Sequence, residues 1–148
     1  MKGKTMPQPT ELDLFLALSK VLTGEKKLDK TLADQYLQRL KGQNALQMQK
    51  VLDEFSKIAN DQYLVFEVKR RIIETKEKGK EDLPPMAQQI IRLWHTSEFF
   101  PLGPDGKPGS TANVGTQKQY YSGLLWKTIQ AHPPTNSIQK YGYWTTKP

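Results

Sequence analysis

The apolar residues of the first 60 positions recur at intervals of three and four, which is the spacing of one face of a helix. This pattern predicts three helices, which run from Thr10 to Gly24, from about Asp29 to Gly42, and from about Ala45 to Ala59. The threonine at the start supplies a capping hydroxyl. The two glycines end their helices, because glycine readily takes the left-handed conformation that follows a last helical turn.

The pattern becomes less regular after residue 60. Residues 61–78 begin with a strand-like composition, but Glu–Arg and Glu–Lys pairs four positions apart favour a helix. Pro84 and Pro85 suit the first turn of a further helix, since proline lacks only a donor that is unpaired there. Three prolines and four glycines in residues 101–116 predict a long loop. A last helix is expected over about 116–130, followed by an extended tail.

These elements predict an all-α protein: a single domain of five to six helices with a long loop near 101–116 and an extended C-terminal tail. The length of 148 residues agrees with one domain. Residues 1–9 are expected to be a disordered N-terminal segment, and residues 10–148 to form the domain.

The absence of cysteine excludes a disulfide framework, a zinc finger, a thiolate-held iron–sulfur cluster and a cysteine nucleophile within this sequence. No apolar run approaches the roughly 20 residues of a membrane span. The first ten residues carry no apolar segment of a signal peptide. The pair Arg70-Arg71 is internal, so it is not a twin-arginine signal.

Charge and aromatic residues are unevenly distributed along the chain. Residues 1–105 hold 17 basic and 15 acidic residues, whereas residues 106–148 hold five lysines and no acid. All three tryptophans and nine of the fourteen aromatic residues lie from Trp94 onward. A stretch of this composition suits a nucleic-acid surface, a protein interface, or a core built from the second half of the chain.

No arrangement of residues in the sequence indicates catalysis. His95 and His132 stand alone, and the pair His95 and Glu98 offers too few ligands for a closed metal site. No serine lies in a nucleophile elbow, and the glycine-rich run 103–109 lacks the Gly-Lys-Ser/Thr ending that holds phosphates. An enzymatic role centred on His95 and Glu98 is therefore the least favoured hypothesis, and the chain by itself is predicted not to be an enzyme.

Three separated motifs indicate a family. The first, in residues 15–36, contains Leu-Thr-Gly followed by Leu-Asp. The second, in residues 90–97, contains Trp-His-Thr-Ser where the family has Trp-Tyr-Thr-Gly. The third joins residues 120–126, with glycine in place of the family's alanine, to Gly-Tyr-Trp in residues 141–144. Together they resemble the small, or gamma, subunit of bacterial membrane-bound FAD-dependent sugar and sugar-alcohol dehydrogenases, the family of sorbitol, gluconate, fructose and glucose dehydrogenase small subunits.

This resemblance implies a non-catalytic accessory subunit. Such a subunit binds a large catalytic subunit of the glucose–methanol–choline oxidoreductase type and supports its maturation and export. FAD is expected in that partner, no cofactor or metal is expected in this chain, and a cytochrome c subunit is a further expected partner. The resemblance implies a periplasmic location, with membrane association through the complex. The family usually carries a twin-arginine signal, which this sequence lacks, so it is either a mature or engineered form or not the export carrier.

The resemblance and the aromatic distribution together give the candidate partner-binding residues. These are Trp94, Tyr120, Trp126, Tyr141, Tyr143 and Trp144. The last three lie in the tail, 133–148, which has fewer internal partners, whereas Trp94 and Trp126 also suit the chain's own core. The lysine excess favours an acidic patch on the large subunit. The alternative function is a basic all-α nucleic-acid-binding module, whose binding would weaken steeply with salt.

Overall fold

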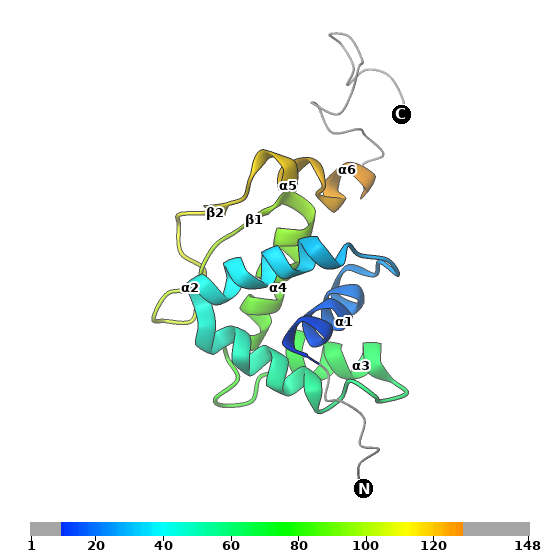
Figure 1. Ribbon diagram of the computed structural model, residues 1–148. Coiled ribbons are helices and arrows are strands. Elements are labelled where there is room, and N and C mark those ends of the chain that lie inside the picture. The colour runs from blue at the N-terminus through cyan, green and yellow to red at the C-terminus, as the bar shows by residue number, and fades with distance from the viewer. Residues whose placement is uncertain (1–9, 129–148) are drawn as a thin grey trace, which may run out of the picture.

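The structure, a computed structural model, describes residues 10–128, so the expected N-terminal segment and the tail lie outside the described residues. The described chain is mostly helical, which confirms the all-α prediction (Figure 1). Its elements are α1 (Glu11–Thr23), α2 (Lys30–Ser56), α3 (Leu64–Val68), the π-helical turn η1 (Lys69–Ile73), α4 (Leu83–Thr96), β1 (Glu98–Phe99), β2 (Asn113–Val114), α5 (Gln117–Tyr121) and α6 (Leu124–Thr128).

The predicted first helix is confirmed, together with both of its caps. The Thr10 hydroxyl accepts a hydrogen bond from the Asp13 amide at 3.0 Å, and the Asp13 carboxylate accepts one from the Thr10 amide at 3.2 Å. These reciprocal bonds satisfy two backbone donors that a helix start leaves unpaired. Gly24 ends α1 with φ +76°, a conformation that glycine adopts without a steric penalty.

The core lies where α1, α2 and α4 pack together, and Trp94 of α4 is at its centre. The buried indole stacks on Phe15 of α1 at 6.5 Å between ring centroids, and meets Tyr36 of α2 edge-to-face at 4.9 Å. Aromatic pairs of this geometry stabilise a core beyond the area that they bury. Figure 1 shows α4 crossing behind α2 in the middle of the molecule. The tryptophan therefore joins the three longest helices of the described chain.

The second and third predicted helices are two halves of α2, and the predicted end at Gly42 is wrong. The helix continues through Gly42 and breaks at Asn44, whose backbone is non-helical with φ −137° and ψ 59°. The buried Asn44 amide donates to the Leu102 carbonyl oxygen and accepts from the Leu102 amide, both at 2.9 Å. At the bend, the Asn44 side chain bonds to both backbone groups of Leu102, as a neighbouring strand would. This contact joins residues that are distant in sequence, so local helix preferences do not predict it.

The segment after α2 is fixed by a buried carboxylate. Glu54 lies 3.3 Å from Lys80, 3.5 Å from Lys57 and 3.4 Å from Arg71. These cations come from the segment before α4 (Lys80), from the residue that follows α2 (Lys57) and from η1 (Arg71). The carboxylate therefore attaches the α3–η1 region, which the sequence predicted as a helix, to the second half of α2.

The long loop is confirmed, but it contains a small sheet that the sequence did not predict. Residues 98–99 pair antiparallel with 113–114, and Leu102 bridges to Pro108. The Gly109 amide donates to the Pro101 carbonyl at 2.9 Å and the Gly103 amide to the Lys107 carbonyl at 2.8 Å. The loop is thus a hairpin that satisfies much of its own backbone.

The prediction of a single helix over about 116–130 is also wrong within the described residues. The chain forms two short helices, α5 and α6, which are separated at Ser122 and Gly123. A Cβ atom at Gly123 would collide with the His95 carbonyl oxygen at the end of α4. The glycine therefore allows the chain to turn closely against α4, and helical periodicity alone does not reveal this contact.

We expect Asn44→Ala to lower the free energy of unfolding by about 2–3 kcal/mol, because it leaves the buried Leu102 amide and carbonyl without partners. Urea denaturation followed by circular dichroism measures this loss. Gln49→Ala is the matched control, since its amide makes only an exposed bond to Asp53 on the same helix; it should cost no more than about 0.5 kcal/mol. Equal losses in the two variants would contradict the role of Asn44.

We expect part of the acid sensitivity of the fold to come from Glu54. Burial by itself raises the pKa of this carboxyl, but the hydrogen bonds and charges of Lys80, Lys57 and Arg71 outweigh burial and lower it below the usual 4.5. A lowered pKa contributes stability at pH values above 4.5, and this contribution is lost as the pH falls through the folded-state value.

Glu54→Gln should therefore flatten the decline of unfolding free energy below pH 4.5, as measured by urea denaturation at a series of pH values. Asp53→Asn removes an exposed carboxylate from the same helix turn and controls for the loss of one charge. If both variants keep the wild-type pH profile, Glu54 is not the source of the dependence.

Candidate functional site

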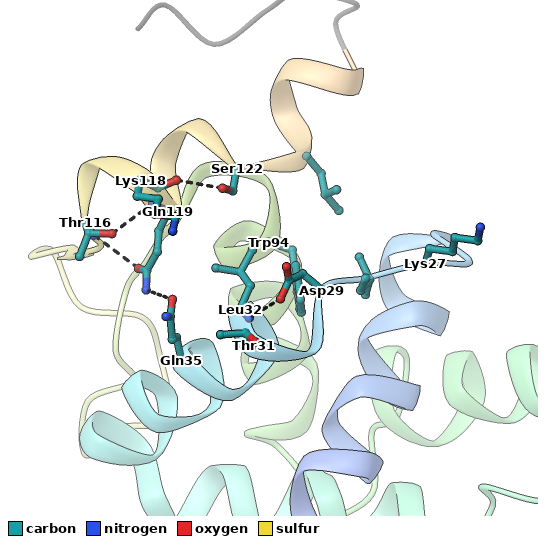
Figure 2. Close-up of a pocket in the computed structure, with 12 residues that line it drawn as sticks. Lys27, Asp29, Thr31, Leu32, Gln35, Trp94, Thr116, Lys118, Gln119 and Ser122 are labelled. Atoms are coloured by element: carbon teal, nitrogen blue, oxygen red, sulfur yellow. Dashed lines mark hydrogen bonds between the residues drawn. The ribbon is translucent and has the colours of Figure 1, made fainter. Parts of the chain in front are cut away.

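A cavity of about 630 Å³ opens between the beginning of α2 and the α5–α6 segment (Figure 2). Its volume lies in the range of ligand and anchor pockets. Its lining residues are Lys27, Leu28, Asp29, Thr31, Leu32, Gln35, Trp94, Thr116, Lys118, Gln119, Ser122 and Leu124. The lining is mixed: the leucines and Trp94 supply apolar surface, and two lysines and several hydroxyl and amide groups supply polar surface. We call it the α2–α5 pocket.

One hydrogen bond joins the two sides of the pocket, and two local bonds fix its α5 side. The Gln119 side-chain amide of α5 donates to the Gln35 side-chain oxygen of α2 at 2.9 Å (Figure 2). The Thr116 hydroxyl caps α5 by accepting from the Gln119 amide at 3.1 Å. The Ser122 hydroxyl donates to the Lys118 carbonyl oxygen at 2.9 Å. The pocket is therefore built between elements that are about 80 residues apart in the chain.

Arg39 of α2 makes the connection behind the pocket. Its guanidinium donates to the Gln119 side-chain oxygen at 2.9 Å, to the Asn113 side-chain oxygen at 2.9 and 3.1 Å, and to the Asn113 backbone carbonyl at 3.0 Å. The same group lies 5.8 Å from the Tyr36 ring centroid and 5.7 Å from that of Phe99. A planar cation with several donors suits such a site, where lysine would satisfy fewer acceptors.

Gly115 lies at the centre of this network, where the surrounding atoms leave no room for a side chain. A Cβ atom would come within 2.6 Å of an Arg39 nitrogen and 2.9 Å of the Ser97 carbonyl, and would collide with the Gln119 side-chain oxygen. The sequence identified the glycine only as a loop residue. It gave no signal for Arg39, Asn113 or Gln119, since their importance arises from a contact between distant segments.

The core beneath the pocket contains polar groups that lack hydrogen-bond partners. Among the described residues, the Tyr36 hydroxyl, the Ser19 hydroxyl and the Trp94 indole nitrogen are buried and unpaired. Burial raises the pKa of Tyr36 to about 12, because the core disfavours the charged phenolate. Each buried polar group without a partner lowers the free energy of unfolding, so these three groups reduce the stability of the core.

The structure brings together two of the predicted partner-binding residues at the α5–α6 corner. The Trp126 indole donates to the Tyr120 carbonyl oxygen at 3.0 Å, and the two rings meet edge-to-face at 5.4 Å. Trp126 and Trp94 are buried, whereas Tyr120 is 40 % exposed. The three tail residues, Tyr141, Tyr143 and Trp144, lie outside the described residues.

His95 and Glu98 each have a structural partner of their own. The His95 ring nitrogen Nδ1 lies 2.9 Å from the Ile91 carbonyl oxygen, and Glu98 pairs with Arg92 at 3.4 Å. Within residues 10–128 no group of three histidine, aspartate or glutamate side chains is placed to hold a metal ion. The geometry provides no support for a catalytic pair at this position.

The described residues also do not form a dinucleotide-binding site of the usual kind. Such a site needs a parallel sheet and a glycine-rich turn that opens a helix, so that backbone amides face the phosphates. The sheet within residues 10–128 is one antiparallel pair of two-residue strands. The glycines of 103–109 bond within their own hairpin. The described residues thus form a small helical fold with a cavity between α2 and α5.

Comparison with known proteins agrees with the motifs in the sequence. The model of the family described as membrane-bound FAD-containing D-sorbitol dehydrogenase matches residues 2–148. The chain belongs to this family, a family of subunits of membrane-bound FAD dehydrogenase complexes. No curated protein and no solved structure matches it. In the part of the chain that the structure describes, no helix is both long and apolar enough to cross a bilayer.

We expect Arg39→Lys to loosen the pocket and to lower the free energy of unfolding by about 2 kcal/mol, because it removes bonds to Asn113 and Gln119 within a partly buried network. Hydrogen exchange should show faster exchange of the amides of residues 113–119, and urea denaturation gives the energy. Gln38→Lys places the same side chain at the neighbouring exposed position and should change neither measurement. Unaltered exchange in Arg39→Lys would remove the guanidinium from its assigned role.

Proposed function

We propose that this chain is a non-catalytic accessory subunit that binds the FAD-containing catalytic subunit of a sugar or sugar-alcohol dehydrogenase. The partner, of the glucose–methanol–choline oxidoreductase type, supplies FAD and the substrate site. The observation that carries the proposal is the family match over nearly the whole chain, combined with a site whose geometry suits docking.

The α5–α6 end of the molecule is the proposed docking face. It combines the α2–α5 pocket with the exposed ring of Tyr120, and apolar pockets beside exposed aromatic side chains are typical centres of binding energy. Lys27 and Lys118 line the same pocket together with one acid, Asp29, so the lining has a net positive charge that suits an acidic patch on the partner. The last described helix, α6, lies at this end as well (Figure 1).

The six aromatic candidates have two different roles in this proposal. Trp94 and Trp126 are buried and support the docking face from within. Tyr120 and the tail residues Tyr141, Tyr143 and Trp144 contact the partner. Tyrosine and tryptophan suit such contacts, because they bury a large area at a small cost in side-chain entropy.

The proposal extends to maturation and to electron transfer. Binding stabilises the catalytic subunit while it takes up FAD and is exported, since a ligand that binds only the folded form shifts the folding equilibrium toward it. The complex acts in the periplasm at the membrane, where a cytochrome c subunit receives the electrons. The family is described as membrane-bound and FAD-containing, which supports the membrane location and the flavin of the complex.

The nucleic-acid alternative gains little from the structure. Nucleic-acid binding needs unneutralised basic side chains along a continuous surface. Many of the described basic residues instead pair with acids, and these are Lys30, Lys41, Lys50, Lys57, Lys69, Lys80, Arg70, Arg71 and Arg92.

A pull-down of the tagged chain from its native cells tests the proposal. We expect a partner of large-subunit size, a flavin absorption spectrum and sugar- or alcohol-dependent dye reduction by the captured complex. Omission of the chain during expression of the catalytic subunit should lower its FAD content and its export. Recovery of the chain alone, or with nucleic acid that salt releases, would contradict the proposal.

Two further sets of variants locate the docking face. Thr31→Trp fills the pocket from an exposed lining position and should prevent capture of the flavoprotein, whereas Asp34→Trp introduces the same ring on α2 outside the pocket lining and should not. Trp144→Ala should weaken binding about 30-fold, as expected for an anchor worth roughly 2 kcal/mol. Equal capture by all of these variants would place the interface elsewhere.

A further inference from the structure

A second surface, at the start of α3, carries exposed apolar side chains. Tyr63 is 65 % exposed, Val65 69 % and Phe66 59 %. We call these three residues the α3 patch. Two other side chains attach the same helix to the core: Val68 is buried, and Leu64 packs against the core. The patch is therefore apolar surface in excess of what the fold needs, and contiguous surface of this kind commonly marks an interaction site.

Basic side chains follow the patch. Lys69 and Arg70, three and four positions after Phe66, are both exposed. Arg70 pairs closely with Glu67 at 2.7 Å, whereas Lys69 lies 3.9 Å from Glu74 and both of those side chains are exposed. Three nearby cations, Lys57, Arg71 and Lys80, pair with the buried Glu54 and add no free charge. The positive charge that follows the patch in the sequence is therefore that of the exposed side chains of Lys69, Lys76 and Lys78.

The α3 patch is far from the docking face. Figure 1 shows α3 at the opposite end of the molecule from α5 and α6. Glu54 and its cations hold the α3–η1 region on α2. A partner on the α5–α6 end would therefore leave the patch accessible and in a fixed orientation.

We propose that the α3 patch is a peripheral membrane contact that inserts into the interface of an anionic bilayer. Aromatic and aliphatic side chains enter the headgroup region while neighbouring cations attract anionic lipid. Tyrosine suits this depth because one end of its ring is apolar and the other is polar. The family is described as membrane-bound, which favours a bilayer as the surface that the patch meets.

Flotation of the full-length chain with vesicles tests this proposal. We expect binding to vesicles of equal parts phosphatidylglycerol and phosphatidylethanolamine, weaker binding to phosphatidylcholine vesicles, and a decrease with added salt. The double variant V65S/F66S should lower the partition coefficient for anionic vesicles about tenfold or more, since it removes the two apolar side chains. Lys69→Glu should lower it as well, by removing one cation and adding one acid.

The matched control is L46S/V114S, which removes two apolar side chains that are 66 % and 68 % exposed on α2 and β2. This variant should bind vesicles as the wild type does. Circular dichroism confirms that each variant is folded. Failure of the wild-type chain to float with anionic vesicles, or equal binding by V65S/F66S, would overturn the proposal.

The pull-down separates this inference from the proposed function. V65S/F66S should still capture the flavoprotein, because the docking face lies at the other end of the molecule. If V65S/F66S loses the flavoprotein instead of the vesicles, the patch is a protein interface and the membrane assignment is wrong. If the chain floats through its patch but captures no flavoprotein, the membrane contact stands and the accessory function does not.

Discussion

Two side chains of α2 determine the shape of the second half of the protein. Asn44 satisfies both backbone groups of Leu102, and Arg39 binds Asn113 and Gln119. The loop hairpin satisfies much of its own backbone, but the Leu102 amide and carbonyl and the Asn113 carbonyl bond to these two side chains and would lose those partners without them. Placement of the loop in turn positions α5, and α5 forms one side of the α2–α5 pocket. The candidate docking site therefore depends on polar contacts to a single helix.

The molecule is divided between an apolar centre and two exposed ends. Trp94 joins α1, α2 and α4 through its contacts with Phe15 and Tyr36, which gives a small protein one rigid core. One end carries the α2–α5 pocket and Tyr120, and the other carries the α3 patch (Figure 1). This arrangement suits a connecting subunit, because a rigid centre fixes the orientation of whatever binds at the two ends. It requires no chemistry in the chain itself.

Ion pairs within the fold determine where positive charge remains on the surface. Many basic residues form ion pairs with acids within the fold, and Glu54 alone pairs with Lys57, Arg71 and Lys80. The net charge of +7 is therefore a poor guide to function by itself. What matters is which cations remain beside apolar surface, and these include Lys118 at the pocket and Lys69 after the α3 patch. Charge beside an apolar contact favours a specific partner or surface over general binding to polyanions.

The sequence by itself determined the helices with strong local signals, the long loop and the family. The Thr10 cap, the Gly24 end and the paired prolines in the first turn of α4 act through neighbouring residues, so a local pattern is sufficient to predict them. Only the tertiary structure decided the bend at Asn44, the turn at Gly123 and the site around Arg39. Each of these depends on a contact with residues that are distant in sequence, and neither periodicity nor propensity contains that information.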